Sequence, residues 1–381
     1  MVKKIFFSLV GLVLFNYGIG QPGSSPALKP RNLNDGIKTA TLSEVGMNPS
    51  VINELSTQIS SNYYPNIHSL LIYKDNKLVY EKYFQGKDQI WGKDLGVIEH
   101  TTNGLHDVRS ISKSVVSACI GIAISQGKIK SVDQKIFDFF DEYAAYDTGM
   151  KKQLTIEHLL TMSSGLDWNE EVPYDNPANT EIQMDNSKDP VKFVLSRPIA
   201  TAPGKEWKYN GGATELLGVI LERATGKKLD QFAEEFLFKP LGIEKFEWTK
   251  FPGTDHPAAA SGLRLRSRDL LKFGILYYNK GKWTGKQIVP AEWVNQSFQT
   301  RIDRPKSGGY GYLFWTLNDT IQKHPVKLIG AVGNGDQRIY FDSTNSLLIV
   351  TTAGNYNIWT IENDSYALLK RKKTLSSALI V

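Results

Sequence analysis

The chain has 381 residues, of which 41% are hydrophobic and 22% are charged, and its formal net charge is +6. This composition excludes a disordered or fibrous protein, and the length suits one large domain or two lobes. The excess positive charge is accounted for by Lys3, Lys4 and the basic residues 370–373, so the rest of the chain is close to neutral. We therefore expect no nucleic-acid partner. We interpret residues 370–373 as the solvated face of a last helix rather than a contact with an anionic membrane.

Residues 1–20 have the pattern of a secretory signal peptide. Two lysines precede the apolar residues 5–15, and small glycines follow them. A transmembrane anchor is the alternative, but the apolar run is shorter than the roughly 20 residues that cross a bilayer. Residues 21–35 are predicted to be a linker because proline, glycine and serine gather there. Residues 36–381 are expected to form one exported domain, periplasmic or secreted, with no integral membrane segment.

Strands are predicted at both ends of this domain and helices between them. Two hairpins are expected, at residues 68–84 and 338–352, because apolar strands flank turn-forming residues there. Helical periodicity and end signals predict helices at 110–125, 156–162, 213–224, 229–236, 268–278, 291–299 and 360–373. The two termini are thus expected to complete one sheet, with a helical lobe inserted between them.

The start of the first predicted helix places a hydroxyl and an amine on one face. Ser110 and Lys113 are three residues apart, so the amine can reach the serine oxygen and take its proton when the amine is neutral. Backbone N–H groups at the helix start can stabilise an oxyanion, and the positive end of the helix is expected to lower the pKa of the lysine. Ser110 is therefore the candidate nucleophile and Lys113 the candidate base.

Two other side chains on the same helix are weaker candidates. Ser125 and Lys128 repeat the spacing, but Gly127 marks a helix end there, where the dipole has the wrong sign for an anion. Cys119 is the chain's one cysteine, so no internal disulfide can form. Its apolar neighbours favour a buried small hydrophobic residue over a catalytic thiol.

Two later segments carry further candidates. Tyr209 lies in a turn-rich stretch that leads into a helix, where a phenol can shuttle protons if a nearby cation lowers its pKa. Aromatic packing is the alternative interpretation of this tyrosine. Gly333 lies in a glycine-spaced segment before the last hairpin, where a substrate could run close to the strand backbone.

In this order, the three segments resemble serine hydrolases related to class C β-lactamases and D-alanyl-D-alanine carboxypeptidases of the penicillin-binding-protein type. That family includes esterases and amide hydrolases like 6-aminohexanoate-dimer hydrolase. Residues 154–166 and 262–270 share the resemblance, which runs from about residue 40 to about residue 360. It implies a β-lactamase-like α/β (α+β) fold. An antiparallel sheet lobe would comprise about residues 36–105 and 255–381, and an all-helical lobe about residues 106–254.

The resemblance also implies roles for individual residues. Ser110 would be acylated, Lys113 would be its base, and Tyr209 would serve as acid and base for the leaving group and the deacylating water. The N–H groups of Ser110 and Asn334 would form the oxyanion hole, each donor contributing about 3 kcal/mol. Further substrate contacts are expected from Gly333, Asn210 and Gln337. The family chemistry needs no cofactor.

Two positions depart from the family's pattern. Asn210 directly follows Tyr209, whereas relatives place the asparagine one residue later, so the amide that would hold an acyl chain is shifted or missing. Ala331 stands where many relatives carry lysine or histidine, which removes the usual partner of a substrate carboxylate. A literal K-S-G begins at Lys306, before a strand predicted at residues 310–315, and we expect this lysine to lie in a loop. Whether it reaches the site is left open.

Histidine is also a common catalytic base and a common metal ligand. His106 and Asp107 precede Ser110 and suggest a serine-histidine-aspartate triad, but no G-x-S-x-G elbow occurs, so a polar loop is expected there. His158 is interpreted as a structural hydrogen-bonding residue. The six histidines are scattered without a ligand motif, which predicts no metal site.

The sequence therefore predicts an exported serine hydrolase that forms an acyl-enzyme with a small-molecule or peptide-like ester or amide. Without a cation at Ala331, esterase or amidase activity is favoured over carboxypeptidase or efficient β-lactamase activity. An apolar acyl pocket could be lined by Trp91, Trp168, Trp207 and Trp315. D-alanyl carboxypeptidase activity, β-lactamase activity and a non-catalytic penicillin-binding-type sensor are the alternatives. The oligomeric state is left open.

Overall fold

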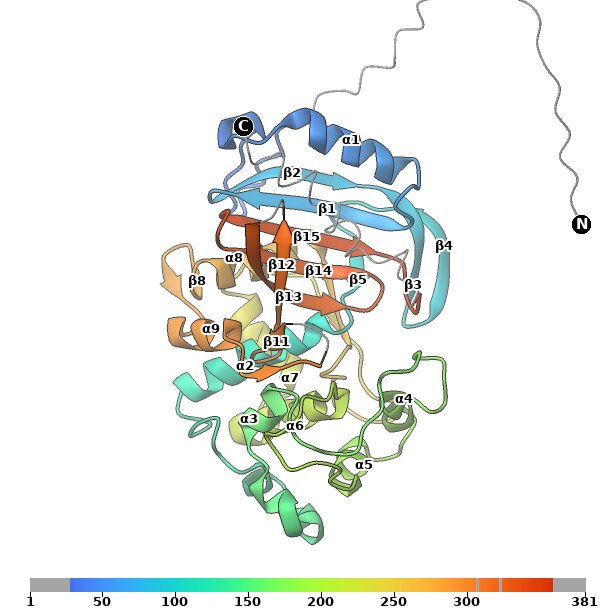
Figure 1. The fold of residues 1–381 in the computed structure, drawn as a ribbon, viewed down its shortest axis with the longest axis vertical. Helices are drawn as coiled ribbons and strands as arrows, with labels where there is room; N and C mark the ends of the chain where they lie inside the picture. Colours follow the sequence, from blue (N-terminus) through green and yellow to red (C-terminus); the bar gives the residue numbers. More distant parts are fainter. Residues whose placement is uncertain (1–27, 306–307, 322–323, 359–381) are drawn as a thin grey trace, which may run out of the picture.

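The computed structural model describes residues 28–305, 308–321 and 324–358. Strands occupy one half of the molecule and most helices the other, with α2 (Ile111–Ser125) between them (Figure 1). The predicted signal peptide, the last predicted helix and Lys306 lie outside the described residues. Among the described helices, none has the length and apolar character needed to span a bilayer.

The main sheet has eight antiparallel strands in the order β10, β11, β12, β13, β14, β15, β1, β2. Their bounds are β1 Ile67–Lys74, β2 Lys77–Tyr83, β10 Ile302–Asp303, β11 Gly309–Tyr310, β12 Trp315–Ile321, β13 His324–Gly333, β14 Gln337–Asp342 and β15 Leu347–Ala353. Strands from the two ends of the domain meet where β1 pairs with β15, with Leu71 opposite Val350. Both predicted hairpins and the sheet formed by N- and C-terminal segments are confirmed.

Short strands form three smaller sheets beside the main one: β3 Gln85–Ile90 with β4 Lys93–Glu99; β5 Leu105–Asp107 with β7 Leu263–Arg266 and β6 Glu247–Trp248; and β8 Lys282–Trp283 with β9 Lys286–Gln287. The prediction of a strand at residues 310–315 is wrong, because β11 ends at Tyr310 and β12 begins at Trp315. Between them Leu313 has a φ of 59°, which an extended strand does not allow.

The main sheet is buried on both faces. Leu70 and Ile72 of β1 belong to one apolar cluster, whereas Leu71 and Tyr73 belong to another. Successive strand side chains point to opposite faces, so this split follows from the alternation along β1. α1 (Pro49–Ser60) contributes to the first cluster, and α8 (Ser267–Tyr278) contributes to the second. The continuous apolar run of β1 is therefore the signature of a strand covered on both sides.

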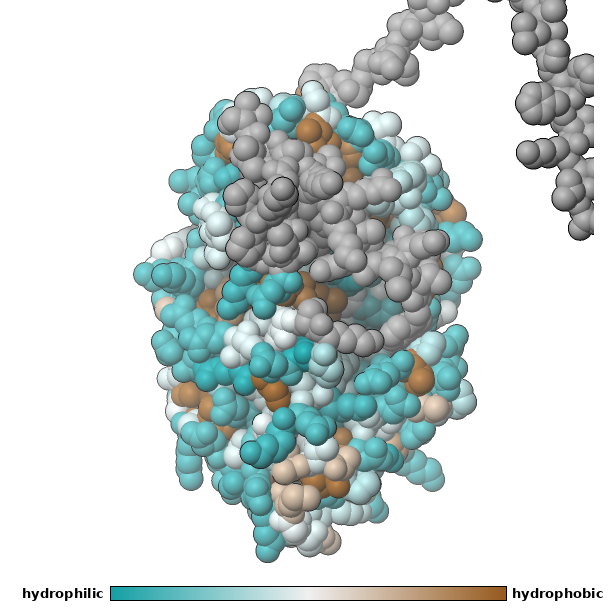
Figure 2. All heavy atoms as spheres, in the orientation of Figure 1, coloured by the Kyte–Doolittle hydropathy of each residue, from teal (hydrophilic) through white to brown (hydrophobic). Residues whose placement is uncertain are grey.

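The remaining helices are α3 Ile156–Leu160, α4 Thr180–Asp185, α5 Pro190–Ser196, α6 Gly211–Thr225, α7 Leu229–Ala233 and α9 Ala291–Phe298. Polar side chains cap several of them at the N-terminus, including Asn48 before α1, Asn179 before α4 and Asn210 before α6. α2 is buried along most of its length, from Ile111 to Ala123. A helix that is buried all round can hold functional groups rigidly between two lobes. Figure 2 shows hydrophilic residues over most of the visible, described face, with apolar ones in separate small patches.

Candidate active site

The backbone that leads into α2 is strained immediately before the predicted nucleophile. Arg109 has a φ of 50°, which is unfavourable for a residue with a side chain. Its guanidinium lies 4.8 Å from the ring of Trp91 and 4.9 Å from that of Tyr356, and it pairs with Asp107 at 3.1 Å. Asp107 is itself buried and also pairs with Arg264 on β7 at 2.8 Å. These contacts fix the turn that delivers Ser110 to the helix start.

The structure brings Ser110 and Lys113 together as the spacing predicts. Ser110 is the N-cap of α2, and the Nζ of Lys113 donates to its Oγ at 3.1 Å. The same Nζ donates to the carbonyl of Ala260 at 3.0 Å, and it also has a hydrogen bond to Tyr209. Three acceptors match the three donors of an ammonium group. Lys113 is 1% exposed, so packing as well as hydrogen bonds fixes the position of the base.

Tyr209 completes this group. It has hydrogen bonds with Ser110 and Lys113, and the Nζ of Lys113 lies 5.0 Å from the centre of its ring. Trp207 and Trp315 pack beside it, with ring centroids 6.1 and 5.6 Å from that of Tyr209. Burial raises the pKa of Tyr209, although the charge of Lys113 opposes this shift. The phenol therefore keeps its proton at neutral pH.

A group of buried carboxylates behind the lysine was not anticipated. Burial by itself would lower the pKa of Lys113, but the charges of Glu181, Tyr209 and Glu170 outweigh it and raise that pKa above the ordinary value. The expectation that the helix start lowers the pKa of Lys113 is therefore wrong, because it ignored these side chains. The lysine is cationic at rest.

The carboxylates of this group have unequal environments. Glu170 accepts from Trp168 Nε1 and from the backbone nitrogen of Gly211, both at 2.5 Å. Burial opposes its ionisation, yet these bonds, a hydrogen bond from Glu181 and the charge of Lys113 hold the pKa of Glu170 below its usual range. Burial and the charge of Glu170 raise the pKa of Glu181 well above its usual range. The pair thus shares one proton, and it carries one negative charge next to Lys113.

Asp185 extends this acidic group towards the substrate space. It lies one turn after Glu181 on α4, and burial together with the charge of Glu170 raises its pKa to about 7. The spacing of Glu181 and Asp185 places them on one face of a helix, which is the signal that the sequence carried.

A pocket of about 240 Å³ opens beside Ser110. Its wall is formed by Gln89, Trp91, Gly92, Arg109, Ser110, Tyr174, Glu181, Ile182, Asp185, Ser261, Asn334 and Asn357. Of the four tryptophans expected to line an acyl pocket, Trp91 lies in this wall, and Trp168, Trp207 and Trp315 do not. Trp168 is buried. Acidic side chains outnumber the single arginine in this wall. That arginine, Arg109, already pairs with Asp107 and stacks on two aromatic rings.

The end of β13 passes very close to the start of α2. A Cβ on Gly333 would lie 2.3 Å from the carbonyl oxygen of Val108 and 3.3 Å from the nitrogen of Ser110. Only glycine allows this approach. Asn334, the next residue, shares the pocket wall with Ser110, and its side chain is held by two hydrogen bonds to Asn357, at 2.7 and 3.0 Å.

Three other positions named from the sequence lie away from the pocket. Asn210 is 1% exposed, and its Oδ1 accepts from the nitrogen of Ala213, so it caps α6 and is not among the pocket-lining residues. Gln337 is fully buried, and its Nε2 donates to Gly335 O at 3.0 Å and Ala353 O at 2.5 Å. The structure thus gives Asn210 Oδ1 and Gln337 Nε2 structural partners, and the expected substrate contacts of these two residues stay predictions. Ala331 is fully buried in β13 and offers no charge.

The competing nucleophiles stay outside the site. Ser125 ends α2, and its hydroxyl donates to Ile122 O at 2.7 Å. Cys119 is fully buried, and burial raises the pKa of its thiol. His158 caps α3 through Thr155, with Nδ1 accepting from the threonine nitrogen at 3.2 Å, which agrees with its predicted structural role.

His106 differs most from expectation. It is fully buried in β5, not in a polar loop, and it does not contact Ser110 as a triad histidine would. Instead it lies with His68, His100 and Asp88 in one buried cluster. Three of the six scattered histidines thus converge in space, which the absence of a short ligand motif did not reveal.

Comparison with known proteins places this geometry in a family. A family model described as Beta-lactamase matches residues 68–369. A protein of Escherichia coli strain K12, provisionally named a D-alanyl-D-alanine carboxypeptidase, is 28% identical over 209 residues, which are 52% of this chain and 48% of that protein. The chain therefore spans about half the length of the curated relatives it matches most strongly.

Solved structures show the same fold. A provisionally named 6-aminohexanoate-dimer hydrolase from Bacillus anthracis superposes with a TM-score of 0.68 at 21% identity, covering 85% of this chain and 82% of the other. A class C β-lactamase superposes with a TM-score of 0.61 at 17% identity, covering 86% of this chain and 95% of the other. The predicted β-lactamase-like fold is confirmed.

Proposed function

Because the chain belongs to the beta-lactamase family, we propose that it hydrolyses an ester or amide bond through an acyl-enzyme on Ser110. The observation that carries this proposal is the contact of 3.1 Å between Lys113 Nζ and Ser110 Oγ, buried beside Tyr209 and open to one pocket. A nucleophile within hydrogen-bond reach of its base, which is in turn oriented by a third group, is the arrangement that covalent hydrolysis requires.

The reaction proceeds in two displacements. Ser110 Oγ bonds to the substrate carbonyl carbon while its proton passes to the Lys113–Tyr209 pair, and the carbonyl electrons move onto oxygen. The N–H groups of Ser110 and Asn334 stabilise this oxyanion. The intermediate then expels the alcohol or amine, which takes the proton from the pair. Water repeats the sequence on the acyl-enzyme and releases the acid.

The resting charges determine when the pair can act as a base. With Lys113 cationic and Tyr209 protonated, no group accepts the serine proton. The reactive form is therefore the one that has lost one proton from the pair, and its population grows as the pH rises. The acidic group behind Lys113 moves this loss to higher pH. An alkaline rise in activity follows.

The pocket supports ester and amide substrates over those with a free carboxylate. Ala331 supplies no cation, and Arg109 is engaged by Asp107 and two aromatic rings. Asp185 in the wall, together with the one negative charge that Glu170 and Glu181 share, would repel a second carboxylate or bury it at a cost. The provisional name of the solved Bacillus anthracis structure supports hydrolysis of an amide bond, but a 6-aminohexanoate dimer itself carries a free carboxylate. The name of the Escherichia coli relative favours the second candidate, D-alanyl carboxypeptidase activity, for which Arg109 would have to leave its partners.

Labelling of the folded chain with a fluorophosphonate, together with turnover of short-chain nitrophenyl esters, tests the proposal. We expect wild type to be labelled and to turn over esters, Ser110→Ala to do neither, and Ser125→Ala to do both. A wild type that is not labelled would indicate a binding module. Much faster turnover of a D-alanyl-D-alanine peptide or a cephalosporin than of esters would contradict the substrate preference.

Export is part of the same proposal. It rests on the lysines and apolar run of residues 1–20. Cleavage of this segment, followed by recovery of the shortened chain in the periplasmic or secreted fraction, would support it. Recovery of the intact chain in the cytoplasm would contradict it.

A further inference from the structure

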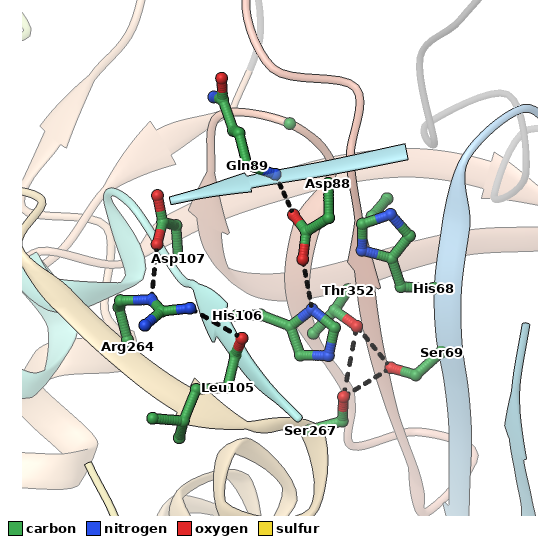
Figure 3. A network of polar contacts seen from close by, with 12 residues as sticks. His68, Ser69, Asp88, Gln89, Leu105, His106, Asp107, Arg264, Ser267 and Thr352 are labelled. Atoms are coloured by element: carbon green, nitrogen blue, oxygen red, sulfur yellow. Dashed lines mark hydrogen bonds and ion pairs between the residues drawn. The ribbon is translucent and has the colours of Figure 1, made fainter. Parts of the chain in front are cut away.

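The histidine cluster lies apart from the catalytic group, behind β5. His68 comes from β1, Asp88 from β3, His106 from β5, and His100 from the connection between β4 and β5. Figure 3 shows Asp88 next to His106, with the ring of His68 beside them. All four residues are buried, and one donor atom from each lies within 4.8 Å of the donors of the other three. The hydrolase chemistry makes no use of them.

Several nitrogen atoms in this cluster have no hydrogen-bond partner within the part of the chain that the structure describes. His68 uses Nε2 for the carbonyl of Lys87 at 2.8 Å, which leaves its Nδ1 unpartnered. His100 has a hydrogen bond to the backbone of Gly86, which leaves its Nε2 unpartnered. Both ring nitrogens of His106 lack hydrogen bonds, and its Nδ1 lies 3.9 Å from Asp88 Oδ2. Buried polar atoms are rarely left without partners, so each of these calls for an explanation.

Two of the three rings have the backbone hydrogen bond that metal-ligating histidines commonly make. A ligating histidine commonly uses one nitrogen for a backbone carbonyl and turns the other towards the ion. His68 has this arrangement with Lys87, and His100 has it with Gly86. Asp88 is held in a similar way, since its Oδ1 accepts from the nitrogen of Gln89 at 2.8 Å.

The surrounding backbone is shaped to admit these rings. A Cβ on Gly86 would lie 2.8 Å from Cδ2 of His68, and one on Gly354 would lie 2.8 Å from its Nε2. The rings of His68 and His100 are stacked at 3.7 Å, which two protonated imidazoles would resist. His68 Nδ1 and His100 Nε2, the unpartnered nitrogens of these two rings, are the atoms that could bind an ion.

We propose that His68, His100, His106 and Asp88 bind one divalent transition-metal ion, with zinc as the best match. Three imidazole nitrogens and one carboxylate oxygen form a tetrahedral donor set that zinc accepts, and borderline metals such as cobalt share it. Four protein ligands leave no open position for water or substrate, so the ion has a structural role. The donor atoms lie within 4.8 Å of one another, and the stacked rings of His68 and His100 would have to turn so that both lone pairs point at the ion.

The ion would support the nucleophile indirectly. His106 is followed by Asp107, which pairs with Arg109 and Arg264, and Arg109 holds the strained turn before Ser110. Fixing His106 therefore fixes the start of the segment that positions the serine. The four residues are positioning residues and do not touch the reacting atoms.

Metal analysis of the full chain tests this inference independently of hydrolytic activity. Protein purified without chelator is assayed for bound metal, then stripped and titrated with Co²⁺ while visible absorption is recorded. We expect one zinc per chain, and a strong tetrahedral cobalt spectrum that saturates at one equivalent. Zinc should raise the melting temperature of stripped protein by several degrees, because an ion that binds only the folded chain stabilises it.

Single substitutions locate the site. His100→Gln and His106→Gln should retain less than about a tenth of the metal, because a ligand is lost. His256→Gln is the matched control, since His256 is partly exposed and pairs with Glu222 at 2.9 Å, and it should bind like wild type. If His106→Gln does not fold, the metal content of His100→Gln and the titration of wild type test the proposal. Folded wild type that binds neither ion, or His100→Gln that binds as wild type does, would overturn the proposal in favour of a metal-free histidine cluster.

Discussion

Replacing Gly333 with alanine tests how closely the end of β13 approaches the nucleophile. The added Cβ would lie 2.3 Å from Val108 O, and a comfortable contact is about 3.5 Å, so the strand end must move by about 1 Å. Val108 O is a backbone atom, and the next nearest atom, Gln337 Cβ at 3.1 Å, is fixed to the backbone, so no side chain can rotate away. The shift would carry the N–H of Asn334 away from the oxyanion. A misplacement of this size, or the loss of one donor, lowers kcat by roughly 100- to 1000-fold.

The assay is kcat/KM for a short-chain nitrophenyl ester, with melting temperature measured in parallel. Gly104→Ala is the matched control, because a Cβ there makes only ordinary contacts, at 3.6 and 3.9 Å. We expect the control to retain activity and Gly333→Ala to lose at least about 100-fold with only a small change in melting temperature. Folded Gly333→Ala with activity within about threefold of wild type would refute the placement of Asn334 in the oxyanion hole.

Three further predictions follow from the environment of α2. Activity should rise with pH into the alkaline range, because the raised pKa values of Lys113 and Tyr209 keep the pair fully protonated at lower pH. An activity maximum below neutrality would contradict this prediction. The double variant Glu170→Gln/Glu181→Gln should shift that rise to lower pH, since it removes the negative charge that the pair places beside Lys113. An unchanged or upward-shifted pH–rate profile would show that this charge does not govern the base. Cys119→Ala should keep phosphonate labelling and ester turnover within about twofold, because the thiol is fully buried, and loss of labelling would implicate the cysteine instead.

Local patterns in the sequence predicted much of the fold. The hairpin of β1 and β2 and that of β14 and β15 have apolar strands and turn-forming residues, and both were found. The hairpin of β3 and β4 was missed because β4 is almost wholly exposed and carries no apolar alternation. α1 was also missed, although Asn48 followed by Pro49 is a helix-start signal that the sequence contains.

Whether a part of the site could be predicted from the sequence also depends on whether its contacts are local or distant along the chain. Ser110 and Lys113 were predictable because one helical turn brings them together. The carboxylates that set the charge of Lys113 come from separate segments, and their effect depends on burial that spacing does not reveal. The histidine cluster is more distant still, since β1, β3 and β5 must pack before His68, Asp88 and His106 meet. Interactions of this kind are decided by topology.

Trapping the acyl-enzyme tests the central claim most directly. Wild-type chain is mixed with a slowly deacylating ester, quenched during turnover, digested and mapped by mass spectrometry. We predict a single acyl group on Ser110, absent from Ser110→Ala and from acid-denatured protein. An acyl group on another residue, or steady turnover with no covalent adduct at any time, would contradict it.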